Sequence, residues 1–246
     1  MGNMFCGYAC IVYAMRGDFE MAAVFIGIAI VLDMLDGRIA RLTGTVSDFG
    51  SEFDSLADVI SFGVAPATLS FAWGLSSLGR LGWAAGFLYV AAAALRLARF
   101  NIQGTGTGDK RYFAGMPSPP AAGVAASTVF AYPAGLHDYR AALPALAMVL
   151  VPAVLMVSTI RFRSFKTIDL QVRRSYTVLI LVAGGIMLIA THPRLVLLVM
   201  AYSYLASPFV GMAITRIRHG SRGDAGQSRS EGAGQQASSP RDSAAG

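Results

Sequence analysis

The sequence predicts an all-α fold, a polytopic membrane helical bundle with about eight transmembrane helices. Hydrophobic residues make up 54% of the 246 residues and charged residues only 14%, whereas soluble domains carry about 25% charged residues. The mean hydropathy is positive, at +0.54. The apolar residues also stand in long blocks, such as residues 141–160, and a helix needs roughly 20 of them to cross a bilayer. A soluble protein with buried helices would not need blocks of that length.

We expect the membrane segments, in chain order, at residues 2–15, 21–42, 56–73, 81–97, 119–134, 141–160, 176–190 and 195–214. Residues 1–216 together form the predicted transmembrane domain. Residues 217–246 consist mainly of Gly, Ser, Gln, Arg and Ala, and such a composition buries too little apolar surface to fold. We therefore predict a disordered cytoplasmic tail there.

The basic residues predict the orientation in the membrane. If the N-terminus lies in the cytoplasm, the opposite side holds only Arg16, Arg80, Arg140 and Arg194 of the 20 lysine and arginine residues. The positive-inside rule therefore places both termini on the cytoplasmic side of the cytoplasmic membrane. Basic residues beside membrane segments face anionic lipid head groups, so the net charge of +6 requires no nucleic-acid partner.

Four aspartates form the candidate site. Asp33 and Asp36 are spaced i,i+3, and Asp54 and Asp58 are spaced i,i+4, so each pair lies on one helix face. All four lie at the cytoplasmic ends of the second and third predicted segments, which a short linker joins, so the two faces can meet. Aspartates at membrane depth are costly unless a cation offsets their charge. This region should therefore hold cations.

Four convergent carboxylates with no cysteine or histidine nearby offer only oxygen ligands. Mg²⁺, Mn²⁺ and Ca²⁺ prefer such ligands, and a shared aspartate could bridge two ions. Gly37 and Gly50 lack a Cβ and would let a phosphate approach the backbone. Arg41 could hold a phosphate with its guanidinium group. The simpler alternative is that the aspartates cap helices or pair with Arg38 and Arg41.

The same residues carry a family resemblance. The run from Asp33 to Asp58 resembles the CDP-alcohol phosphotransferase signature, D-x2-D-G-x2-A-R-x8-G-x3-D-x3-D, with every spacing kept. The fixed positions are Asp33, Asp36, Gly37, Ala40, Arg41, Gly50, Asp54 and Asp58. So many matches at fixed spacing make a specific signal.

The resemblance implies a six-helix catalytic core with two further helices, a homodimer, and a transferase that uses two divalent ions, Mg²⁺ or Mn²⁺. The implied metal ligands are Asp33, Asp36, Asp54 and Asp58, with Asp58 also acting as the catalytic base. The implied CDP-binding residues are Asn3, Gly37, Ala40, Arg41, Gly50 and Ser51. Ser51 departs from the family, whose members often carry Lys there, which puts one contact to substrate phosphate in doubt. Asn3 could instead cap its helix.

Four stretches in and around the signature narrow the acceptor alcohol. The stretches FDSLADVISFGVAPA (53–67), RLARFN (96–101), FAGMPSPPAAG (113–123) and GNMFCG (2–7) resemble the phosphatidylserine synthase branch of the family. The implied substrates are CDP-diacylglycerol and L-serine, which would give phosphatidylserine and CMP in phospholipid biosynthesis. The alternative acceptors are glycerol 3-phosphate, inositol phosphate and choline.

A serine site should contain a cation, because serine carries a carboxylate. Arg96 and Arg99 are spaced i,i+3 at the cytoplasmic end of segment 81–97, and with Asn101 they are the candidate serine-binding residues. The plainer interpretation is that both arginines only follow the positive-inside bias, and that Asn101 caps the helix.

Two other classes of membrane protein also use intramembrane aspartates. A prenyltransferase binds a diphosphate through aspartates and Mg²⁺, but at other spacings and without a role for the Gly37-to-Arg41 pattern. A cation transporter places aspartates along an ion path, commonly with repeated halves and broken helices near the midplane. The sequence shows neither feature, and its aspartates lie at one edge of the membrane.

Overall fold

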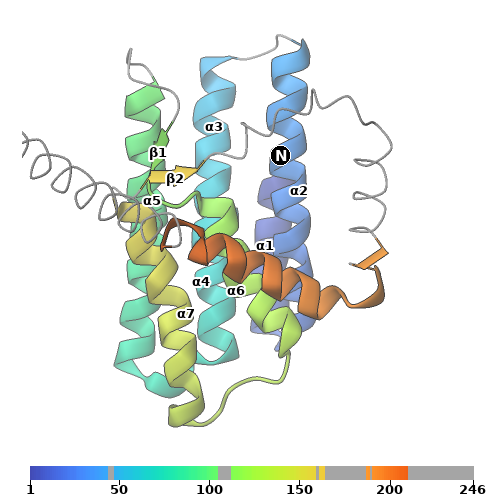
Figure 1. Ribbon diagram of the computed structural model, residues 1–246, viewed down its shortest axis with the longest axis vertical. Helices are drawn as coiled ribbons and strands as arrows, with labels where there is room; N and C mark the ends of the chain where they lie inside the picture. Colours follow the sequence, from blue (N-terminus) through green and yellow to red (C-terminus); the bar gives the residue numbers. More distant parts are fainter. Residues whose placement is uncertain (44–46, 105–111, 159–160, 164–186, 189, 210–246) are drawn as a thin grey trace, which may run out of the picture. The chain divides into compact units, whose positions relative to one another are not determined.

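The computed structural model describes residues 1–43, 47–104, 112–158, 161–163, 187–188 and 190–209. Within these ranges the chain is helical apart from loops and one pair of short strands (Figure 1). The predicted segment 176–190 lies almost entirely outside the described residues, and the predicted tail lies wholly outside them. The residues up to Leu205 form one compact unit.

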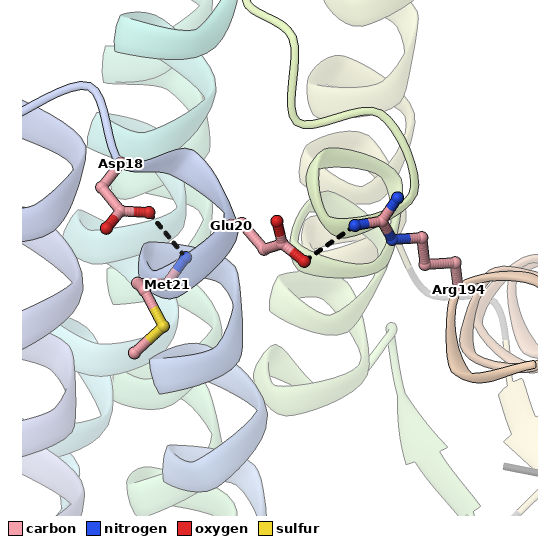
Figure 2. A network of polar contacts seen from close by, with 4 residues as sticks. All are labelled: Asp18, Glu20, Met21 and Arg194. Carbon is pink, nitrogen blue, oxygen red and sulfur yellow. Dashed lines mark hydrogen bonds and ion pairs between the residues drawn. The ribbon is translucent and has the colours of Figure 1, made fainter. Parts of the chain in front are cut away.

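Helices α1 (Gly2–Met15) and α2 (Phe19–Thr43) pack side by side and are joined by a tight turn. Gly17 in this turn has a φ of 77°, a left-handed conformation that glycine adopts without steric cost. Asp18 then caps α2, because its carboxylate accepts a hydrogen bond of 3.2 Å from the Met21 N–H (Figure 2). The observed bounds match the predicted segments 2–15 and 21–42 to within two residues.

The third predicted segment is a continuous helix in three parts, α3 (Asp48–Asp58), the π-helical turn η1 (Val59–Val64) and α4 (Ala65–Trp73). It begins well before the predicted start at residue 56. Ser47 caps it by accepting a hydrogen bond of 3.1 Å from the Gly50 N–H. The π-helical turn starts directly after Asp58, and such turns are rare and frequent at functional sites.

The bundle is completed by the 3-10 turn η2 (Leu75–Leu78), α5 (Arg80–Gly104), α6 (Ser118–Ala131) and α7 (Tyr139–Val157). Prolines begin α6 in its first turn, where the missing N–H has no helical partner to lose. Helix α5 approaches η2 so closely that a Cβ at Gly82 would overlap the Leu75 carbonyl oxygen. The core contains many buried alanines from several helices, and small side chains allow the close helix contacts typical of membrane bundles.

A short antiparallel strand pair, β1 (Tyr112–Ala114) with β2 (Arg161–Arg163), lies beyond the ends of α5 and α7. Gly115 follows β1 with a φ of 87°. The next residue, Met116, donates a backbone hydrogen bond of 2.9 Å to the Leu155 carbonyl in α7. The sequence did not predict this pair, because three-residue strands are too short to show a period. It fixes the entry of α6 against the end of α7.

Residues 193–205 are helical and overlap the predicted segment 195–214 from two residues before its start. They lie across the bundle rather than alongside its helices (Figure 1). Arg194 near the start of this helix forms an ion pair of 2.8 Å with Glu20 of α2 (Figure 2). Further along, the hydroxyl oxygens of Tyr202 and Thr128 in α6 are 3.1 Å apart. These contacts attach the helix to α2 and α6.

Three helices in the described part of the chain are long and apolar enough to cross a membrane, namely Phe49–Trp73, Arg80–Asn101 and Tyr139–Val157. Helix α1 is apolar but shorter. The helical class of the fold is therefore confirmed, and its apolar helices agree with a membrane protein. The count of about eight transmembrane helices stays a prediction.

Candidate active site

Three of the four predicted aspartates converge in the structure. Asp33 projects from α2, and Asp54 and Asp58 project from α3, one helical turn apart. One carboxylate oxygen from each lies within 4.8 Å of the other two. Asp33 and Asp58 are half-buried and Asp54 is exposed, so the cluster lies at the edge of the packed helices. The predicted meeting of two helix faces is therefore observed for these three residues.

Asp36, the fourth aspartate, lies one turn beyond Asp33 on α2 and is exposed. It is not one of the three converging residues, but it interacts electrostatically with both Asp54 and Asp33. It therefore lies near enough to the cluster for its charge to be felt there, and its role as a metal ligand stays a prediction.

The cluster fits a divalent metal ion by its donor atoms and its size. All three donors are carboxylate oxygens, which hard cations prefer. Two oxygens on opposite sides of such an ion lie about 4–5 Å apart, because each metal–oxygen distance is about 2.0–2.6 Å. The observed separations, up to 4.8 Å, agree with this requirement. Without a cation, three carboxylates so close would repel one another.

Asn3 contacts the cluster from α1. Its Nδ2 atom donates a hydrogen bond of 3.0 Å to Oδ1 of Asp58. The helix itself begins after Met1 without a side-chain cap, so Asn3 does not cap it. The alternative role that the sequence left open for Asn3 is therefore wrong.

Arg96 on α5 lies beside the cluster. The side chain is half-buried, and it interacts electrostatically with Asp58 and Asp33. Its Nη1 atom donates a hydrogen bond of 2.7 Å to the hydroxyl oxygen of Ser118, the first residue of α6, which is buried. A half-buried guanidinium group beside carboxylates provides a fixed cation at the site.

The other two candidate serine-binding residues have partners elsewhere. Arg99 is exposed and donates a hydrogen bond of 3.3 Å to the Val157 carbonyl at the end of α7. Asn101 and Ser55 are hydrogen-bonded through their side chains, with the Asn101 Nδ2 atom 3.0 Å from the Ser55 oxygen. Of the three candidates, Arg96 alone is seen to interact with Asp58. The serine-binding roles stay predictions.

Five of the six predicted CDP-binding residues, all except Asn3 of α1, lie along the two helices that carry the aspartates. Gly37 lies in α2, and Gly50 and Ser51 lie exposed in the first turn of α3. Ala40 and Arg41 belong to α2 by their backbone, while their side chains lie outside the described part of the structure. The two helices therefore place these residues on either side of the linker, and their contacts to CDP stay predictions.

An apolar cavity of about 550 Å³ lies between α2, α6 and the helix of residues 193–205. Gly27, Gly123, Phe130 and Met200 are among the residues that line it. Leu32, which precedes Asp33 in the chain, also lines it, so the cavity reaches the neighbourhood of the cluster. Its walls suit a hydrocarbon chain.

Two residues at this site were missed by sequence reasoning. Ser118 accepts a hydrogen bond from Arg96, 22 residues earlier in the chain. Ser55 accepts one from Asn101, 46 residues later in the chain. Serines in helices are common, and no spacing marks a partner so far away. Only the fold brings these pairs together.

The structure combines apolar helices with an acidic, oxygen-only cluster, a half-buried arginine beside it and an apolar cavity. These features suit a membrane enzyme that acts on a lipid with a charged head group. The particular family follows from comparison. The sequence model of the family described as CDP-alcohol phosphatidyltransferase matches residues 1–160, so the chain belongs to that family. The resemblance drawn from the aspartate signature is thereby confirmed.

Several curated proteins of known name are similar in sequence to this chain. A CDP-diacylglycerol–serine O-phosphatidyltransferase of Helicobacter pylori is 41% identical over 184 residues, covering 72% of this chain and 75% of the relative. A protein of the same name from Bacillus subtilis is 34% identical over 166 residues, covering 68% and 88%. An archaetidylserine synthase of Methanothermobacter thermautotrophicus is 36% identical over 164 residues, covering 66% of each chain.

Proposed function

We propose that this protein transfers the phosphatidyl group of CDP-diacylglycerol to the hydroxyl group of L-serine, giving phosphatidylserine and CMP. The family and the names of the relatives support this activity. The single structural observation that carries it is the convergence of Asp33, Asp54 and Asp58 beside Arg96. An acidic metal cluster suits a diphosphate, and a cation next to it suits the carboxylate of serine.

Asp33, Asp54 and Asp58, joined by Asp36, would hold two divalent ions, Mg²⁺ or Mn²⁺. When bound, these ions supply positive charge that stabilises the phosphoryl oxygens and the departing phosphate of CMP. The residues themselves set the place of the diphosphate, because they come from two helices that flank one edge of the bundle.

Asp58 is the proposed general base. It accepts the proton of the serine hydroxyl group, and the serine oxygen then forms a bond to the phosphorus that carries diacylglycerol. The bond between that phosphorus and the bridging oxygen breaks, and CMP leaves with the electron pair. The half-buried position of Asp58 and its hydrogen bond to Asn3 hold the carboxylate in place for this transfer.

Arg96 is the proposed contact to the serine carboxylate. Its guanidinium group forks well onto a carboxylate, and the bond to Ser118 fixes one of its nitrogens in advance. Arg99 and Asn101, which follow Arg96 on α5, would be the further contacts to serine. Because Arg96 also interacts with Asp58, a serine bound here would have its hydroxyl group near the base.

The CDP moiety would lie along Gly37, Ala40, Arg41, Gly50 and Ser51. The apolar cavity would take an acyl chain of the lipid, since it is lined by Leu32, the residue before Asp33, and has apolar walls. The site would face the cytoplasm, with both termini on that side and the helices in the cytoplasmic membrane. The family resemblance further suggests a homodimer.

The test is the release of CMP by purified protein in detergent, with CDP-diacylglycerol, Mn²⁺ or Mg²⁺, and one acceptor at a time. Release that depends on serine, with phosphatidylserine formed in equal amount, supports the proposal. Release only with glycerol 3-phosphate, an inositol phosphate or choline would keep the family and contradict the acceptor. No release with any acceptor from folded protein would contradict the activity itself.

A further inference from the structure

Asn3 carries a buried amide whose hydrogen bond connects α1 to the proposed base. The side chain belongs to a residue that is only 2% exposed, and its Nδ2 atom donates to Oδ1 of Asp58 at 3.0 Å. Its Oδ1 atom is buried and has no hydrogen-bond partner among the described residues. Burying an amide is costly unless it is hydrogen-bonded. The bond to Asp58 is thus the contact that justifies an amide at this position.

The backbone around Asn3 is itself held against the helix that carries Asp58. The hydroxyl group of Ser61, which is buried in η1, donates a hydrogen bond of 2.9 Å to the Asn3 carbonyl. One turn further along α1, a Cβ at Gly7 would come within 2.8 Å of the Ser61 Cα atom. Glycine at this position therefore permits a close crossing of α1 and η1, and any larger residue would force the two helices apart.

The crossing is built at the π-helical turn. This turn starts directly after Asp58 and contains Ser61, so the residue that holds α1 follows the base by three positions. A shift of α1 along or away from this turn would carry Asn3 with it. Two contacts with Ser61 therefore fix the distance from the Asn3 amide to the Asp58 carboxylate. One is the hydrogen bond from Ser61 to the Asn3 carbonyl, and the other is the close packing of Gly7 against Ser61.

From these contacts we infer that Asn3 is a positioning residue for Asp58, held in place by the Gly7–Ser61 crossing of α1 with η1. Its amide occupies one oxygen of the carboxylate and fixes the rotation of the group. The other oxygen would then remain available to an ion or to the serine hydroxyl group. This role rests on the proposed function of Asp58, and it differs from a contact to the nucleotide because it acts on catalysis rather than on CDP binding.

The role predicts a particular kinetic signature. A misplaced base slows turnover without weakening the binding of either substrate, and loss of a residue that orients a catalytic ligand typically costs 10- to 100-fold in activity. Asn3→Leu keeps nearly the same shape but lacks the donor. We expect it to lower kcat by about 10- to 100-fold, with the KM values for serine and CDP-diacylglycerol and the affinity for CMP changed by less than about threefold.

Cys10→Ala is the matched control. Cys10 is buried on the same helix, two turns from Asn3 by sequence, and its Sγ atom lies 3.9 Å from the Ala65 carbonyl. Its replacement loosens the packing of α1 without touching Asp58, so it should lower the apparent melting temperature and leave kcat within about threefold. If Asn3→Leu fails to fold in detergent, Asn3→Asp carries the test. That variant also keeps the shape, and its carboxylate repels Asp58, so kcat should again fall at least tenfold.

The outcomes separate this inference from the activity. Wild-type protein that releases CMP only with serine establishes the activity before any variant is compared. A folded Asn3 variant with wild-type kcat would overturn the positioning role. So would a variant that binds CMP at least tenfold more weakly with kcat unchanged, because Asn3 would then serve the nucleotide. Wild-type protein without CMP release would instead contradict the proposed function.

Discussion

Arg96 of α5 donates a hydrogen bond of 2.7 Å to the hydroxyl oxygen of Ser118, the first residue of α6. The arginine also stacks near the ring of Phe100, with its guanidinium carbon 6.0 Å from the ring centre. A long flexible side chain is thereby held at three places, its own helix, the start of α6 and the acidic cluster. Because the guanidinium group is already fixed before substrate binds, it would be a selective contact for a carboxylate.

Arg96→Lys should raise the KM for serine by about tenfold or more, because a lysine keeps the charge but loses the forked geometry that matches a carboxylate. Ser118→Ala should raise the same KM by a smaller factor. The measurement is CMP release over a range of serine concentrations. Arg80→Lys is the matched control, since Arg80 is exposed at the opposite end of α5 from Arg96. An unchanged KM in Arg96→Lys would move the serine carboxylate to another residue.

Asp58→Asn should lower kcat by about 10²- to 10⁴-fold, because an amide cannot accept the hydroxyl proton and is a poorer metal ligand. The change is isosteric, so folding should be kept. Asp18→Asn provides a control at the other end of the bundle, where the carboxylate only caps α2 (Figure 2). Serine-dependent CMP release is measured for both at saturating Mn²⁺. Near-normal release by Asp58→Asn would assign the base to another group.

Much of this architecture could be predicted from the sequence because membrane helices are long and apolar, and both properties can be read directly from the residues. The bounds of α1 and α2 were predicted within two residues. The start of α3 was not, because residues 48–55 are mostly polar, with three acidic side chains, and a hydropathy criterion begins a segment only where a continuous apolar run begins. The polar cap at Ser47, rather than the apolar run, determines where this helix starts.

The candidate site, too, could be predicted only in part from the sequence. The spacing of the aspartates predicts that each pair shares a helix face, and the structure confirms that the two faces meet at Asp33, Asp54 and Asp58. Contacts between distant parts of the chain had no such signal. The bonds from Asn3 to Asp58 and from Arg96 to Ser118 depend on how α1 and α6 cross their neighbours, which no local period encodes.

Gly82→Ala should destabilise the fold, because a Cβ at this position would overlap the Leu75 carbonyl, and backbone cannot move aside as a flexible side chain can. A cost of about 1–3 kcal/mol is expected for such overpacking. Gly86→Ala is the control on the same helix, since a Cβ there would have no neighbour within 4 Å. Thermal unfolding in detergent compares the two. Equal melting temperatures would mean that α5 and η2 are less closely packed than the structure shows.

The ion pair between Glu20 and Arg194 should contribute little to stability. Both side chains are about half exposed, at 44% and 52%, and exposed pairs are worth about 0.2–1 kcal/mol. Arg194 also lies 5.8 Å from the ring centre of Phe130, so Arg194→Gln should lower the melting temperature more than Glu20→Gln. The difference between each variant and wild type should shrink in high salt. A large, salt-independent loss in Glu20→Gln would show that the pair is shielded from solvent.

Gly27→Leu should discriminate between lipid substrates if the apolar cavity holds an acyl chain. A Cβ at Gly27 would meet no atom within 4 Å, so the leucine side chain can enter the cavity without moving the backbone. Excluding about two methylene groups from the cavity costs about 1.6 kcal/mol, slightly more than a tenfold loss in affinity. The apparent KM for long-chain CDP-diacylglycerol, as a mole fraction in mixed micelles, should therefore rise by about tenfold.

A short-chain CDP-diacylglycerol does not need the far part of the cavity, so its KM should change little in Gly27→Leu. The matched control is Gly86→Leu, which adds the same side chain at an open position outside the cavity and should affect neither substrate. Equal KM increases for long and short chains would indicate a general disturbance of α2. No change for either would place the acyl chains outside this cavity, and the cluster at Asp33 would then receive its lipid from another side of the helix.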